Sequence, residues 1–110
     1  MDKLTILLID DDKTACDEIE NCISHTDDMY LVGITDNIYA ALEQVQTTHP
    51  DVILLELELH HGSGNGLFFL QKLSQMQLAV KPFILITTNN TSPVTFSSAR
   101  QFGADFILVK

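Results

Sequence analysis

Short apolar runs alternate with amphipathic segments along the whole chain. Between the runs, apolar residues recur at the spacing of helices that bury one face. Near-continuous apolar runs are typical of parallel strands covered on both faces, and helical crossovers connect such strands. The pattern therefore predicts an α/β domain with a parallel sheet, whose strands cover residues 4–9, 29–34, 52–57, 83–87 and 105–109.

Four helices are predicted between these strands. Asp12 is the expected N-cap of a helix over 13–25, and Asp36 or Asn37 is the expected N-cap of the second. The third and fourth helices carry the apolar residues of the segments 67–73 and 94–102. Because Gly103 follows the fourth helix directly, we expect it to adopt the left-handed conformation that ends many helices.

A doubly wound sheet needs helices on both of its faces. With five strands and only four helices, part of one face of the sheet would lack a covering helix. We therefore expect a fifth helix after Lys110, and we interpret residues 1–110 as one domain trimmed from a longer protein.

Composition narrows the class of protein. A chain of 110 residues with 45% hydrophobic residues is typical of one globular domain. The net charge of −9 argues against direct binding of nucleic acid, which requires clustered Lys and Arg. No apolar stretch is long enough to span a bilayer. Cys16 and Cys22 are interpreted as unpaired thiols in a reducing compartment, so we expect a cytoplasmic protein without membrane contact.

Polar residues follow four of the apolar runs directly. Parallel sheets bind ligands just beyond the carboxyl ends of their strands, so these residues are expected to lie together. Clustered carboxylates suit Mg²⁺, while a hydroxyl and an ammonium can contact a phosphoryl oxygen. We therefore predict a site for metal-assisted phosphoryl chemistry, built from the acidic pair Asp10 and Asp11 together with Glu56, Thr87 and Lys110.

Several motifs resemble those of the receiver domain of two-component response regulators, over essentially the whole chain. They are Leu-Leu-Ile-Asp-Asp-Asp at 7–12, Pro-Asp-Val-Ile-Leu-Leu-Glu at 50–56, Gly-Ser-Gly at 62–64, Ile-Thr-Thr at 86–88, and Gly-Ala-Asp at 103–105 together with Lys110. The resemblance implies a flavodoxin-like, doubly wound parallel sheet of five strands in the order 2-1-3-4-5.

The resemblance also implies roles for individual residues. A histidine kinase or phosphotransfer protein would pass a phosphoryl group to the carboxylate that follows the third strand, with Mg²⁺ bound. Asp11 matches the direct metal ligand, Asp10 its water-mediated partner, and the backbone carbonyl of Glu58 a further ligand. Thr87 matches the switch hydroxyl, and Lys110 matches the lysine that pairs with the phosphoryl group.

Three features depart from the pattern of that family. Glu56 stands where the acceptor Asp is expected, Ile107 stands where a switch Tyr or Phe is usual, and the chain stops before the family's last helix. Phe106 is adjacent to Ile107, but strand alternation directs it to the other face of the sheet.

These residues favour a regulatory domain rather than an enzyme. Glu56 places a permanent negative charge near the phosphoryl position, so it resembles an activating mimic, natural or engineered. We expect Lys110 to contact Glu56 and Mg²⁺ binding to be weak or absent. The expected partners are the kinase or phosphotransfer protein, an output domain that can be DNA-binding, and a second copy of the chain.

Two alternative functions remain open. The run through Asp10 and Asp12 is also similar to the nucleophile motif of haloacid-dehalogenase-like phosphatases, although that alternative leaves Glu56 unexplained. A dimerisation module that works without phosphorylation would account for Glu56 and Ile107 together. His60 and His61 could contribute to a transition-metal site, but adjacent loop histidines rarely point the same way.

Overall fold

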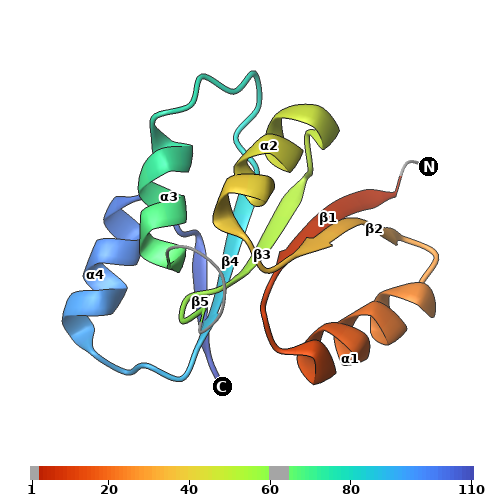
Figure 1. Ribbon diagram of the computed structural model, residues 1–110, viewed down its shortest axis with the longest axis horizontal. Helices are drawn as coiled ribbons and strands as arrows, with labels where there is room; N and C mark the ends of the chain where they lie inside the picture. Colours follow the sequence, from red (N-terminus) through yellow and green to blue (C-terminus); the bar gives the residue numbers. More distant parts are fainter. Residues whose placement is uncertain (1–2, 60–64) are drawn as a thin grey trace.

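Strands and helices alternate along the chain (Figure 1). The computed structural model describes residues 3–59 and 65–110. The predicted strands and helices are all present, with small shifts at their ends. They are β1 (Leu4–Ile9), α1 (Lys13–Ser24), β2 (Met29–Thr35), α2 (Ile38–Thr48), β3 (Val52–Glu56), α3 (Gly66–Ser74), β4 (Phe83–Thr88), α4 (Pro93–Gln101) and β5 (Phe106–Val109).

The five strands form one parallel sheet in the order β2-β1-β3-β4-β5. This is the order that the resemblance implied, so the expected flavodoxin-like fold is confirmed. The order changes direction between β1 and β3, and open parallel sheets bind their ligands at such a point. Within the described residues, no helix is long and apolar enough to cross a membrane.

Local side-chain contacts explain where the helices begin and end. The Asp12 carboxylate accepts hydrogen bonds from the first amides of α1, and Asn37, rather than Asp36, does the same for α2. After α4, Gly103 has a φ of 107°, so the predicted left-handed conformation is confirmed. The amide of Ala104 then donates to the carbonyl of Ala99, which closes the end of the helix.

The two faces of the sheet are covered differently. Helices α2, α3 and α4 lie on one face, and α1 lies on the other (Figure 1). Strand residues on the first face are fully buried against Ile38, Phe69 and Leu70 from these helices. The main core of the domain therefore lies on this face. Each large apolar side chain that is fully buried there stabilises the fold by roughly 1.5–3 kcal/mol.

On the α1 face, a strip of apolar side chains stays open to solvent. Phe83, Phe106 and Leu108 are each about half exposed. An apolar groove of about 520 Å³ runs between α1 and the middle strands, with Ile19, Leu54 and Leu85 among its lining residues. The predicted gap in the helix layer is therefore present in the described chain.

Candidate functional site

Four strands bring their polar residues to one edge of the sheet. Glu56 ends β3 and lies directly opposite Thr87 of β4 in the strand register. Asp10 follows β1, and Lys110 follows β5. The parallel sheet thus brings together the residues that the sequence predicted, because their strands all end at the same edge.

The Glu56 carboxylate is buried and fully engaged in contacts. Its side chain is only 4% exposed. The Lys110 ammonium forms an ion pair with Oε2, and the Thr87 hydroxyl donates a hydrogen bond to the same oxygen at 3.2 Å. The backbone N–H of Glu58 donates to Oε1, also at 3.2 Å. Each oxygen of Glu56 therefore has a donor, and the expected contact with Lys110 is present.

The ionisation of this pair reflects its surroundings. Burial raises the pKa of Glu56, and the neighbouring Glu58 carboxylate acts in the same direction, while the contact with Lys110 offsets only part of the rise. For Lys110, burial alone would lower the pKa, but the contact with Glu56 holds it above its usual range. The ammonium is therefore firmly charged, and it stabilises a carboxylate that is held largely out of water.

The three successive aspartates have different surroundings. Asp10 is buried, and its carboxylate accepts a hydrogen bond of 2.9 Å from the amide of Asp12. Asp12 uses its own carboxylate to cap α1, through the amides of Thr14 and Ala15. Asp11 is half-buried. Because Asp12 is turned to the helix, only Asp10 and Asp11 remain as candidates for the acidic pair of the site.

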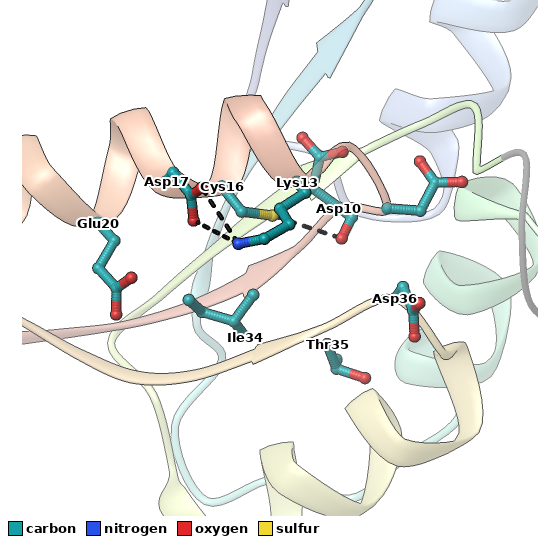
Figure 2. A pocket seen from close by; sticks show the side chains of 9 residues that line it. Asp10, Lys13, Cys16, Asp17, Glu20, Ile34, Thr35 and Asp36 are labelled. Carbon is teal, nitrogen blue, oxygen red and sulfur yellow. Dashed lines mark hydrogen bonds and ion pairs between the residues drawn. The ribbon is translucent and has the colours of Figure 1, made fainter.

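An acidic pocket of about 500 Å³ opens beside this pair, between α1 and β2 (Figure 2). Asp10 and Asp11 are among its lining residues. Lys13 forms an ion pair of 3.2 Å with Asp17. The thiol of Cys16 lies at the same wall and donates to the backbone carbonyl of Asp10 at 3.5 Å. The carboxylates give the pocket a negative potential that favours cations.

The side chain of Glu58 takes part in the site, although the sequence predicts a role only for the backbone carbonyl of this residue. The carboxylate accepts hydrogen bonds from the Thr88 hydroxyl and, at 3.1 Å, from the amide of Asn90. Burial alone would raise the pKa of Glu58, but these bonds and the contact with the Glu56 side chain hold it below its usual range. The sequence does contain a signal for this contact. Glu58 lies next to the end of one strand, and the polar residues Thr88 and Asn90 lie at and after the end of the neighbouring strand.

The oxygen atoms of the site are of the type that binds Mg²⁺, but their arrangement does not favour a bound ion. Carboxylate and carbonyl oxygens are the ligands that this ion prefers. The ion pair with Lys110, however, turns the Glu56 carboxylate away from a role as metal ligand. Within residues 3–59 and 65–110, no three His, Cys, Asp or Glu side chains are grouped to hold a metal ion. Weak or absent binding of Mg²⁺ stays a prediction.

Two further predictions concern residues near the site. Ile107 pairs with Ile86 in the sheet register and packs against the core, while Phe106 is about half exposed. Strand alternation therefore separates these two side chains, as expected. His60 and His61, together with residues 62–64, lie outside the described residues.

Comparisons with known proteins give one consistent result. The family described as the response regulator receiver domain matches residues 6–110. A protein-glutamate methylesterase/protein-glutamine glutaminase of Nitrosomonas europaea is 31% identical over 109 residues, which are 97% of this chain and 29% of that protein. Its counterpart from Thiobacillus denitrificans is 30% identical over 107 residues, with 96% and 29% coverage. The chain thus spans less than a third of these curated relatives.

Solved structures show the same fold. The signal receiver domain of the response regulator NarL from Mycobacterium tuberculosis superposes with a TM-score of 0.87 and 23% identity, covering 99% of this chain and 85% of that chain. The response regulator domain of Thermotoga maritima CheB gives 0.82 and 20%, with 98% and 78% coverage. A LuxR-family DNA-binding response regulator from Staphylococcus aureus gives 0.83 and 19%, with 96% and 85% coverage.

Proposed function

Because this chain belongs to the response regulator receiver domain family, we propose that residues 1–110 act as a receiver in two-component signalling, with Glu56 as a permanent substitute for the phosphorylated acceptor. The domain regulates an output domain or partner through its surface and has no enzymatic activity of its own. The family match and the meeting of Asp10, Glu56, Thr87 and Lys110 at one sheet edge support this function.

One observation carries the proposal for Glu56. Its carboxylate already holds the Thr87 hydroxyl and the Lys110 ammonium, the two groups that the family resemblance assigns to the phosphoryl group. The Thr87 hydroxyl is thus already bound at position 56, and no phosphoryl transfer is needed to bring it there. The substitution is incomplete, because one carboxylate brings a single charge and two oxygens, while a phosphoryl group brings nearly two charges and three oxygens.

The same geometry opposes phosphorylation of Glu56 itself. The extra methylene of Glu displaces the attacking oxygen by about an ångström relative to Asp, and misplacement on that scale can cost about a hundredfold in rate. Both oxygens also have hydrogen-bond or ion-pair donors that an incoming phosphoryl group would have to displace. Glu56 is therefore a non-accepting variant of the site, and we expect binding of Mg²⁺ there to be weak or absent.

The proposed partners follow from the family and the surface charge. A histidine kinase or phosphotransfer protein would recognise the receiver surface, and the signal would pass to an output domain or to a second copy of the chain. A DNA-binding output domain is one candidate, since the LuxR-family regulator from Staphylococcus aureus shares the fold. With a net charge of −9, the domain itself does not bind nucleic acid, and we place it in the cytoplasm.

The phosphatase alternative is not favoured by the position of Asp12. That function would need the Asp12 carboxylate to face a substrate, but it caps α1 through two backbone amides. The alternative of a dimerisation module independent of phosphorylation does not account for the contacts that Thr87 and Lys110 make with Glu56.

Incubation with acetyl phosphate and Mg²⁺, followed by mass spectrometry, tests this function. We expect no acid-labile adduct on the unsubstituted chain. In Glu56→Asp, the phosphoryl group should pass to the aspartate carboxylate with release of acetate and leave one adduct per chain. A stoichiometric adduct on Glu56 would refute the non-accepting site. Failure of Glu56→Asp to accept the group would instead indicate a receiver that has lost its chemistry.

A further inference from the structure

The Glu58 side chain connects the end of β3 to the loop between β4 and α4. One carboxylate oxygen, Oε1, accepts hydrogen bonds from the Thr88 hydroxyl and from the Asn90 amide. The partners lie thirty and thirty-two positions further along the chain. Thr88 is fully buried, and the Asn90 amide also donates to its hydroxyl oxygen at 2.9 Å. The three groups therefore form a closed cluster in which Glu58 supplies the negative charge.

This cluster continues to the first turn of α4. The side-chain oxygen of Asn90 accepts a hydrogen bond of 2.7 Å from the amide of Ser92. Ser92 is the N-cap of α4, and its hydroxyl accepts from the amide of Thr95. A displacement of Glu58 would therefore change the hydrogen bonding of the segment that leads into α4.

Glu58 also contacts the side chain at the centre of the site. Its backbone N–H donates to Oε1 of Glu56 at 3.2 Å, while its carboxylate reaches the loop. One residue thus touches Glu56 through its main chain and Asn90 through its side chain. A change in the group at position 56 would alter the N–H contact of Glu58 and could be transmitted to the loop through the same residue.

We propose that the Glu58 carboxylate is a positioning residue that fastens the β4–α4 loop to β3 and couples the group at position 56 to the start of α4. This inference deepens the proposed receiver function and rests on it for its biological meaning. The fastening itself is a property of the isolated chain. It can be measured without a phosphoryl donor, a kinase or an output domain.

Amide hydrogen exchange tests the fastening in the 110-residue chain. In Glu58→Ala we expect exchange at the Asn90 amide to be faster by roughly ten- to a hundredfold, because a hydrogen bond to a charged acceptor is lost. Glu58→Gln keeps an acceptor oxygen and should show a smaller increase. Glu43→Ala removes an equal charge from an exposed position on α2 and should leave Asn90 unchanged.

A second variant covers the case in which Glu58→Ala does not fold. Thr88→Val keeps the buried volume and removes the hydroxyl that bonds both Glu58 and Asn90. It should also accelerate exchange at Asn90. Unchanged protection of Asn90 in the folded Glu58→Ala variant, or in Thr88→Val where that variant does not fold, would overturn the fastening.

The coupling is tested by combining substitutions at positions 56 and 58. Glu56→Gln should shift the Asn90 amide resonance in the otherwise unsubstituted chain and should shift it far less in the presence of Glu58→Ala. An equal shift in both backgrounds, or none in the first, would overturn the coupling. Phosphoryl acceptance by Glu56→Asp tests the receiver function separately. If that acceptance fails while exchange at Asn90 depends on Glu58, the receiver has lost its phosphoryl chemistry and the positioning role of Glu58 stands.

Discussion

The Lys110 ammonium lies against the Glu56 carboxylate, although β4 separates their two strands in the sheet. The contact crosses above the end of β4, where the Thr87 hydroxyl donates to the same carboxylate oxygen. One buried acidic side chain thus joins the ends of three neighbouring strands. Its removal should affect both the stability of the sheet edge and the state of the site.

Substitution of Lys110 should destabilise the domain. Lys110→Met leaves the buried Glu56 carboxylate without its cation. Because the lysine side chain is 34% exposed, water can replace it in part. We expect a loss of about 1–3 kcal/mol in the free energy of unfolding, less than for a fully buried pair. Chemical denaturation measures it.

Lys81→Met is a matched control, since Lys81 pairs with Asp105 at a more exposed position. We expect it to cost less than about 1 kcal/mol. The double variant Lys110→Met/Glu56→Gln should recover part of the loss, because no unpaired buried charge remains. Equal stability of Lys110→Met and the unsubstituted chain would contradict the importance of this ion pair.

The same ion pair should limit binding of Mg²⁺. Titration followed by amide shifts near Asp11 and Glu56 should give weak binding, in the millimolar range. In Lys110→Met, Glu56 is released as a ligand, and we expect tighter binding because the local negative charge increases. Saturable binding of the unsubstituted chain at micromolar Mg²⁺ would contradict the competition between Lys110 and the metal.

The two cysteines should differ strongly in reactivity. Burial, the largest cause, and the nearby carboxylates of Asp10, Asp12, Asp17 and Asp11 together raise the pKa of the Cys16 thiol from 9.0 to about 11. Cys22 is exposed. At pH 8, iodoacetamide should therefore modify Cys22 and spare Cys16 in the folded chain, while both react in denaturant. Peptide mapping of the alkylated chain checks this, and equal modification of both in the native state would contradict it.

The raised pKa of Cys16 also predicts a pH dependence of stability. The folded state holds the thiol proton more tightly than the unfolded state does. As pH rises from 9.0 through about 11, the unfolded state loses this proton first, so the free energy of unfolding should fall in that range. The serine hydroxyl of Cys16→Ser does not titrate in this pH range. The variant should therefore lose the part of the decrease in the free energy of unfolding that Cys16 causes.

The open apolar strip on the α1 face should cause self-association of the 110-residue chain. Leu108 is 51% exposed and lies on the same face as Phe83. Leu108→Lys should weaken association, because a charge resists burial against another copy. Val94→Lys, at an exposed position on α4, should not. Sedimentation velocity across a concentration series decides this, and a stable monomer at high concentration would show that α1 covers the face sufficiently.

The sheet edge with its site was predictable from sequence because of the strand pattern. Each of Asp10, Glu56, Thr87 and Lys110 directly follows or ends an apolar run, and a parallel sheet brings those ends together. The contact between Lys110 and Glu56 followed from their opposite charges at that edge. Position within a strand was therefore sufficient to predict which polar groups meet.

The side-chain direction of Glu58 could not be predicted in this way. Glu58 lies beyond the end of β3, where the alternation of a strand no longer fixes the direction of a side chain. Its direction depends on the Thr88 hydroxyl and the Asn90 amide, whose positions are set by the path of the β4–α4 loop. Asp36 and Asn37 were likewise equivalent in sequence, and only the chain direction before α2 selects Asn37 as the cap.

The claim that Glu56 substitutes for a phosphorylated acceptor is tested most directly by its effect on the switch residues. Backbone amide spectra should be recorded for the unsubstituted chain and for Glu56→Asp, before and after treatment with a phosphoryl donor. We expect the amides of Thr87, Asn90 and Lys110 in the unsubstituted chain to be displaced from the untreated variant towards the phosphorylated one. If they coincide with the untreated variant, Glu56 fills the acceptor position without reproducing the phosphorylated state.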